Sequence, residues 1–197
     1  VNIVEVVTAY PNLDSEEAST LYFGDNVRDI DFASLAENGE NADYQWLNQY
    51  MASASPTTKN EYTGLFKDYN VILITAESFS PWAVDEKLTP TLYKMIHTGF
   101  VMNNFYIPAF NNTSDGEYMV CTGLIPNGQG NHSFQDTADN DMALCFGNIL
   151  GPLGYSTTAY HPHTYTFYER DQAHPNMGYT YKGYGNGLDV TYQWPEA

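Results

Sequence analysis

The run YNVILITAE, at residues 69–77, constrains the fold of this chain more than any other stretch. It is a nearly unbroken series of β-branched and aliphatic residues, which is typical of a strand buried on both faces of a sheet. The run ends at Glu77, and open α/β sheets place functional groups at the carboxyl ends of such strands. We therefore expect Glu77 to be functional; the alternative is an edge residue that reaches water.

Helices and strands are expected to alternate after this run. In LTPTLYKMIHTGF, Thr89 can cap a helix, Pro90 suits its first turn and Gly99 can end it. The order strand, helix, strand, helix, helix, strand, helix predicts a layered α/β fold with parallel character. The other expected elements are a strand at 100–108, helices at 112–126 and 139–155, a strand at 156–163, a helix at 166–179 and an irregular tail from 181.

The chain divides into two regions of different composition. Residues 1–60 are acidic and contain few apolar clusters, so we interpret them as a loosely structured lead-in and linker with a short amphipathic helix at 44–52. Residues 61–197 contain the apolar runs and form the predicted domain.

The charge of the chain excludes some classes of partner. It has 24 acidic and 7 basic residues, a formal charge of −17, whereas a nucleic-acid groove needs a basic stripe. The same balance disfavours electrostatic docking on anionic lipid. It is compatible with cation binding, but we favour a solvated acidic surface as the explanation.

Two cysteines, Cys121 and Cys145, are too few for a disulfide framework. They can pair or stay free, and we expect them to act as small core residues.

The stretch NNTSDGEYM, residues 111–119, precedes an apolar helical run. Ser114 and Glu117 have the spacing of a capping box, so one interpretation is purely structural. A hydroxyl at a helix N-terminus also meets unpaired N–H groups and the positive end of the helix dipole, which favours phosphate. Such a hydroxyl needs activation to attack phosphorus, and a hard cation such as Mg²⁺ or Mn²⁺ held by oxygen ligands is one route.

Four segments in this order resemble the lipoteichoic acid synthase and phosphoglycerol transferase family of the alkaline phosphatase and sulfatase superfamily. They are NVILITAESFS, TPTLYKMIHTGFVMNNFY, NNTSDGEYMVCTGLIP and YHPHTYTFYERD, and the resemblance runs from about residue 57 to residue 179. It implies an alkaline phosphatase-like α/β/α sandwich, present here only in part. It also implies metal-dependent transfer of phosphoglycerol from a phosphatidylglycerol-like lipid to a cell-envelope polymer or glycan, outside the bacterial membrane.

The resemblance also implies roles for single residues. Glu77 matches a metal ligand, and Thr113 matches the nucleophile, which also ligates the Mn²⁺ or Mg²⁺. His161, Tyr168 and Arg170 match the residues that hold glycerol phosphate, and Tyr168 stands where the family usually has Trp.

Structural alternatives exist for these residues. Arg170 could form a surface ion pair with Glu169 or Asp171, and His161 could be a satisfied buried histidine. His161 and His163 alternate along a strand and could also form a metal pair.

The family completes its metal site with an Asp-His pair further along the chain, and this sequence contains no Asp-His dipeptide. We therefore expect the chain to be the N-terminal half of a catalytic domain, with little turnover alone, from a parent protein anchored by upstream membrane helices.

Rival functions follow from the same segments. A sulfatase needs a Cys or Ser nucleophile in a C-x-P-x-R type context, whereas Cys121 is followed by TGLIP, with no Arg in place. A phosphoethanolamine transferase or a phosphodiesterase is compatible with the segments, because the donor head group cannot be read from them. The rival from another class is a non-catalytic binding fragment with an aromatic surface.

Overall fold

The chain forms two compact units, one comprising residues 8–72 and the other residues 1–7 with 73–197. The computed structural model describes residues 2–3, 23–76, 79–106, 113–127 and 132–191.

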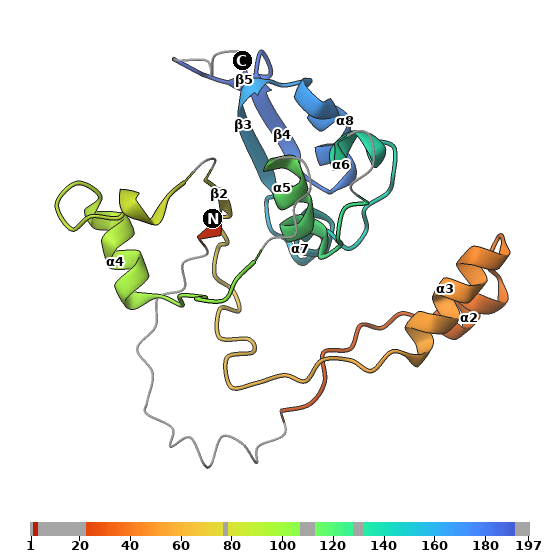
Figure 1. Ribbon diagram of the computed structural model, residues 1–197. Helices are drawn as coiled ribbons and strands as arrows, with labels where there is room; N and C mark the ends of the chain where they lie inside the picture. Colours follow the sequence, from red (N-terminus) through yellow and green to blue (C-terminus); the bar gives the residue numbers. More distant parts are fainter. Residues whose placement is uncertain (1, 4–22, 77–78, 107–112, 128–131, 192–197) are drawn as a thin grey trace. The chain divides into compact units, whose positions relative to one another are not determined.

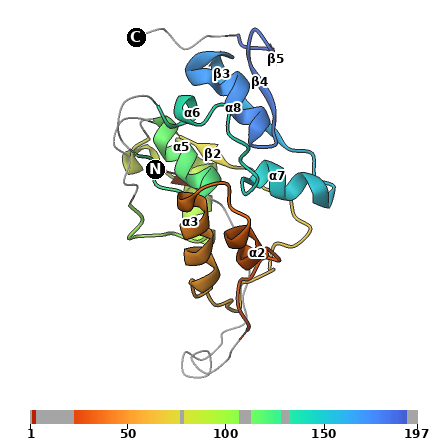
Figure 2. The same ribbon diagram turned by 90° about the vertical axis from the view of Figure 1, so that its right-hand side faces the viewer.

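The unit at 8–72 contains a pair of helices, α2 (Phe32–Glu37) and α3 (Ala42–Ser53), which lie side by side (Figures 1 and 2). Each helix begins with a side-chain cap: Asp31 accepts from the backbone N–H of Ser34, and Asn41 accepts from that of Tyr44. The predicted helix at 44–52 is confirmed as α3. Helix α2 was not predicted, because the sequence indicated only a loosely structured lead-in before that helix.

The larger unit mixes helices and strands, as the sequence predicts. Its first elements are β1 (Asn2–Ile3), β2 (Ile74–Thr75), a 3₁₀ turn η1 (Pro81–Ala83), α4 (Pro90–Thr98), α5 (Thr113–Thr122), α6 (Ser133–Asp136) and α7 (Phe146–Leu150). They are followed by η2 (Gly151–Leu153), β3 (Thr158–Thr164), η3 (Phe167–Glu169), α8 (Arg170–Asn176), β4 (Thr180–Tyr184) and β5 (Gly187–Leu188).

Strands β3, β4 and β5 form a small sheet in which both neighbouring pairs are parallel. The connection from β3 to β4 runs through η3 and α8, which is the crossover that a parallel pair requires. The predicted α/β class with parallel character is therefore confirmed.

The core of the larger unit lies among α5, α6, α8 and the start of α7. Helix α8 packs on β4, and α6 contacts both α5 and α8 (Figure 1). Both cysteines are free and buried in this core. The buried cluster comprises Tyr118, Cys121, Phe134, Cys145, Ala173 and Met177.

A pair of glycines allows α7 to approach the end of α8 closely. A Cβ on Gly178 would lie 2.3 Å from the backbone nitrogen of Asn148, and Gly178 also has a φ of +87°. The Asn148 side chain then donates to the carbonyls of Met142 and Asn176 at 3.0 and 2.7 Å. These bonds fix the exit of α8.

The predicted doubly buried strand at 69–77 is wrong for the residues that the structure describes. Only Ile74–Thr75 forms a strand, paired antiparallel with Asn2–Ile3, and Ile72 is 77% exposed. A central strand needs a hydrogen-bonded neighbour on each edge, and within the described ranges β1 is the one strand paired with it. Glu77 itself lies outside the described residues.

Three other expectations need correction. Residues 100–106 form no strand, although this stretch is apolar. The helix expected at 139–155 shrinks to α7 and η2, and the change from α-helix to 3₁₀ turn falls at Gly151 and Pro152, which are poor helix formers. The tail expected to be irregular contains β4 and β5.

The predicted helices at 88–100, 112–126 and 166–179 are confirmed as α4, α5 and η3 with α8. The strand predicted at 156–163 is confirmed as β3. No helix in the described part of the chain has the length and apolar character needed to cross a bilayer.

Candidate functional site

The predicted nucleophile, Thr113, is the first residue of α5. Its side chain and Glu77 both lie outside the described part of the structure, so their predicted roles stay predictions. What the structure describes is the helix that begins at Thr113 and the side chains that fix it.

The first turn of α5 is held by buried polar side chains. Ser114 and Asp115 are both buried, and the Ser133 hydroxyl on α6 donates a hydrogen bond to Asp115 Oδ1. Water does not compete for a hydrogen bond at a buried position, so this bond resists movement of the first turn of α5. Asp115, in the first turn of α5, is therefore anchored by α6.

The capping box expected from Ser114 and Glu117 does not form. Ser114 lies inside α5 rather than before it, and the Glu117 carboxylate is bonded to residues of α8 instead. The spacing was correct for a cap, but the helix begins two residues earlier than the box requires.

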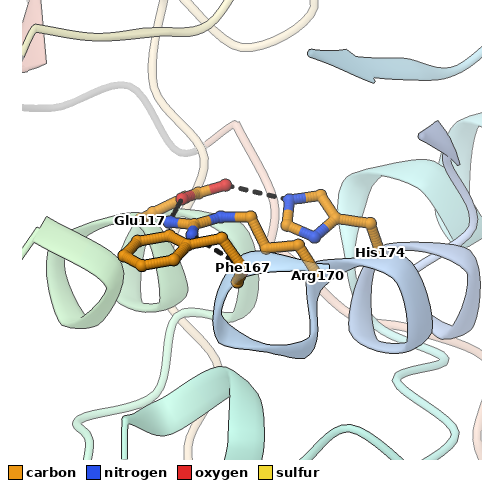
Figure 3. Close-up of polar contacts among 4 residues, drawn as sticks. All are labelled: Glu117, Phe167, Arg170 and His174. Carbon is orange, nitrogen blue, oxygen red and sulfur yellow. Dashed lines mark hydrogen bonds and ion pairs between the residues drawn. The ribbon is translucent and has the colours of Figure 1, made fainter. Parts of the chain in front are cut away.

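Glu117 joins the two motifs that lie far apart in the sequence (Figure 3). Arg170 Nη2 donates to Glu117 Oε2 at 3.0 Å, and His174 Nε2 lies 2.9 Å from Glu117 Oε1. An ionised carboxylate only accepts, so Nε2 is the ring nitrogen of His174 that carries a proton. Arg170 and His174 are four residues apart on α8 and present one face to Glu117.

The pKa of Glu117 reflects this position. Burial raises the pKa, but the hydrogen bond from His174 and the charge of Arg170 outweigh burial and lower it to about 2. The Glu117 side chain is 20% exposed, whereas that of Arg170 is 3% exposed. Glu117 is therefore an ionised partner for a buried cation at neutral pH.

Arg170 is not the surface ion pair that the sequence allowed as an alternative. It is 2% exposed, and its charged partner is Glu117 rather than Glu169 or Asp171. Its guanidinium carbon lies 5.3 Å from the ring centroid of Phe134 and 5.5 Å from that of Tyr168. Aromatic faces at this distance stabilise a cation, and more strongly when water is excluded.

Tyr168 lies where the backbone takes an uncommon conformation. Tyr168 and Glu169 have φ values of +58° and +56°, a left-handed region that side chains other than Gly and Asn rarely adopt. The Tyr168 ring packs at a tilt against Phe167, with centroids 3.9 Å apart, and against His132, with centroids 3.8 Å apart. Consecutive strained residues of this kind cluster at functional sites.

His161 and His163 alternate on β3 and share its inward face. Their ring centroids are 6.1 Å apart, and Phe167 lies against both rings. Among the described residues, no group of three or more His, Cys, Asp or Glu side chains could hold a metal ion. The structure thus gives no support to a metal pair made by these two histidines.

His161 is not a satisfied buried histidine. Its Nδ1 is buried and has no hydrogen-bond partner within the described ranges. Burial, and then the nearby charge of Arg170, lower the pKa of His161 to about 4. The ring is therefore neutral at physiological pH, and its buried Nδ1 lacks a hydrogen-bond partner among the described residues.

Sequence reasoning missed the pairing of Glu117 and did not single out His174. The signal for His174 was its spacing of four residues from Arg170 on a predicted helix, which places both side chains on one face. The signal for Glu117 was obscured, because its spacing from Ser114 fitted a cap.

The profile of the sulfatase family matches residues 69–196, which is more than half of the chain. The chain belongs to the sulfatase family. This membership places it in the alkaline phosphatase and sulfatase superfamily, and its small parallel sheet with flanking helices is a partial alkaline phosphatase-like α/β fold. Neither the search of curated proteins nor that of solved structures found a match.

Members of this family typically depend on a divalent metal. The predicted donors in this chain, the carboxylate of Glu77 and the hydroxyl of Thr113, are hard oxygen ligands, which suit Mg²⁺ or Mn²⁺. The described residues show no metal site, so the roles of Glu77 and Thr113 as metal ligands stay predictions.

Proposed function

We propose that this chain carries the nucleophile and anion-binding part of a metal-dependent phosphoglycerol transferase. The sulfatase-like domain makes the chain part of a superfamily of hydrolases and transferases. Within it, the donor we propose is a lipid such as phosphatidylglycerol, and the acceptor a hydroxyl of a cell-envelope polymer or glycan. The site would then work at the outer face of a bacterial membrane.

One observation carries this proposal: the ion pair between Glu117 and Arg170. Glu117 lies four residues after Thr113, which is about 6 Å along the axis of an α-helix. The pair therefore brings an arginine to within about one helical turn of the proposed nucleophile. A phosphoryl transfer site needs a cation close to the nucleophile, because negative charge accumulates on the phosphate in the transition state.

The reaction has two halves. In the first, the Thr113 hydroxyl gives up its proton as Oγ bonds to the phosphorus of the donor, the bond from phosphorus to the diacylglycerol oxygen breaks, and that oxygen takes up a proton. In the second, an acceptor hydroxyl bonds to phosphorus and gives up its proton, and Thr113 Oγ leaves and is reprotonated. A covalent intermediate of this kind divides one difficult substitution into two easier ones.

The residues of the chain have separate roles in this scheme. Arg170 presents a guanidinium to the phosphate, and neutral His161 offers a ring nitrogen to a hydroxyl of the glycerol. The Tyr168 ring forms an apolar wall for the glycerol group. Glu77 and Thr113 would hold a divalent cation, which when bound lowers the pKa of the Thr113 hydroxyl and offsets phosphate charge.

Sulfatase chemistry is disfavoured despite the name of the family. Cys121 lacks the C-x-P-x-R context that such a nucleophile needs, and burial raises its pKa to about 12. A buried thiol of this kind is an inert core residue.

The proposal is tested on the full-length gene product with Mn²⁺ and vesicles that contain phosphatidylglycerol. Intact-mass spectrometry after acid quenching should show one added phosphoglycerol group, and fragmentation should locate it on Thr113. The Thr113→Ala variant should show no adduct and no transfer. Ser114→Ala is the matched control, since it removes the neighbouring hydroxyl from the same helix turn.

Full transfer activity in Thr113→Ala would contradict the nucleophile assignment. Phosphatidylethanolamine vesicles distinguish the related transferase, because an adduct formed only from that lipid would replace phosphoglycerol with phosphoethanolamine as the transferred group. Retained folding with no adduct from either lipid would favour the non-catalytic binding fragment.

A further inference from the structure

Both oxygens of the Glu117 carboxylate are occupied, each by a different side chain of α8. One oxygen accepts from Arg170 at 3.0 Å and the other contacts His174 at 2.9 Å (Figure 3). A carboxylate held at two points cannot rotate without losing a bond. Glu117 therefore fixes the direction in which Arg170 leaves its helix.

Arg170 has few other polar restraints. Its Nη1 donates to the Phe167 carbonyl at a long 3.4 Å, and its buried Nε has no partner in the described part of the chain. The rings of Phe134 and Tyr168 restrict movement of the guanidinium perpendicular to its plane. They do not fix its rotation within that plane. The strongest orienting contact of the guanidinium is thus the bond to Glu117.

His174 is itself held firmly, so it can act as a fixed support. It is 3% exposed, and its ring lies 4.8 Å from the ring centroid of Tyr181 and 5.1 Å from that of Phe134. The restraint therefore extends from the sheet, through His174 and Glu117, to Arg170.

We propose that Glu117 is a positioning residue, which holds the Arg170 guanidinium in the orientation that binds the phosphate of the substrate. This inference rests on the proposed function, because it takes Arg170 as the phosphate ligand. The relevant ligand chemistry is a glycerol phosphate monoester or diester, and Glu117 acts on it only through Arg170.

Simple electrostatics predicts the opposite effect, and this makes the inference testable. A carboxylate 3.0 Å from Arg170 cancels much of its positive charge, so removing that carboxylate should strengthen anion binding if charge alone mattered. If orientation matters more, removing it should weaken binding. The sign of the change distinguishes the two effects.

The experiment is a calorimetric titration of glycerol 1-phosphate into the full-length protein loaded with Mn²⁺. Glu117→Gln should weaken binding about tenfold, as loss of an outer-shell partner commonly does. Glu117→Asp keeps the charge but shortens the reach, and it should weaken binding to a similar extent. Glu169→Gln is the matched control, because it removes the same charge beside Arg170, and its affinity should be unchanged or slightly higher.

The Arg170→Met background tests whether Glu117 acts through Arg170. Binding in Arg170→Met should be at least as weak as in Glu117→Gln, and adding Glu117→Gln to it should weaken binding no further. Circular dichroism of each variant at the titration temperature verifies that it is folded.

Each outcome of the titration decides the inference. Unchanged or tighter binding in folded Glu117→Gln overturns the inference alone, as does an additive loss in the Arg170→Met background. If the wild-type protein binds no glycerol phosphate, the proposed function fails and the inference fails with it. If Glu117→Gln does not fold, the folded Glu117→Asp variant decides the result by the same criteria.

Discussion

Two parts of the chain show opposite relations between composition and burial. Segment 69–76 is the most apolar stretch of the sequence, yet Ile72 is 77% exposed. In the assembly of α5, α6, α8 and the β3–β4 pair, charged Arg170 is 2% exposed. The difference teaches that burial follows the partners that distant segments supply, and that composition alone does not decide it.

The largest effect should come from the core of the assembly. Phe134→Ala deletes a ring with 0% exposure that packs on Tyr118 and on the Arg170 guanidinium, so we expect a loss of about 3–5 kcal/mol in the free energy of unfolding. The matched change in the other segment, Ile72→Ala, should cost less than about 0.5 kcal/mol. Urea denaturation of both variants checks this, and equal losses of stability would contradict the difference in burial between the two segments.

A smaller loss of stability should follow from adding a methyl group where α7 and the end of α8 approach closely. Gly178→Ala combines left-handed strain with a backbone clash, so we expect a loss of about 2 kcal/mol or more. Gly64→Ala is the control, because Gly64 has a φ of +81° but open space around it, and it should lose only about 1 kcal/mol. Similar melting temperatures for both variants would show that the close approach is unimportant.

The pH dependence of stability sharpens the comparison further. The pKa of His161 is lowered to about 4 in the folded protein, whereas an unfolded histidine has a pKa of about 6.5. The stability that is fully present above pH 6.5 is therefore lost as the pH falls from 6.5 toward 4. Glu117, with a pKa of about 2, loses its contribution in a lower window, below about pH 4.5. The His161→Gln variant should therefore show a flatter stability profile between pH 6.5 and 4 than the wild type.

The control for this profile is His97→Gln on the exposed end of α4. Denaturation midpoints at several pH values should leave its slope unchanged in that window. An unchanged slope in His161→Gln would contradict the assignment of a buried, neutral ring.

The smallest effect should be a gain. Glu169 has a φ of +56° at the entry to α8, and glycine adopts this conformation without strain. Glu169→Gly should therefore raise the free energy of unfolding by up to about 1 kcal/mol. Glu169→Ala serves as the control, since it removes the same side chain and keeps the strain, and a gain in both variants would assign the effect to the lost carboxylate.

Local patterns predicted α4, α5, α8 and β3 well, because their signals lie within the segments. Pro90 and Gly99 marked α4, and Gly123, with a φ of +73°, marked the end of α5. The same reasoning failed for segment 69–76 and for β4, because strand formation depends on pairing with residues elsewhere in the chain.

The sequence singled out the motifs of the candidate site but not the connection between them. It suggested roles for Thr113, His161, Tyr168 and Arg170 through a family resemblance, and those roles stay predictions. No local rule links Glu117 to a residue that lies 53 positions later. A carboxylate at capping distance and a carboxylate in a buried ion pair have the same sequence pattern. Only the packing of α5 against α8 distinguishes them.

The most direct test of the account is a double-mutant cycle between Glu117 and Arg170, measured by urea denaturation of the wild type, Glu117→Gln, Arg170→Met and the double variant. The account predicts a coupling energy of about 1.5 kcal/mol or more, because each single change leaves a poorly solvated charge without its partner. Additive losses, with a coupling below about 0.5 kcal/mol, would show that Glu117 does not join the two motifs and would contradict the account.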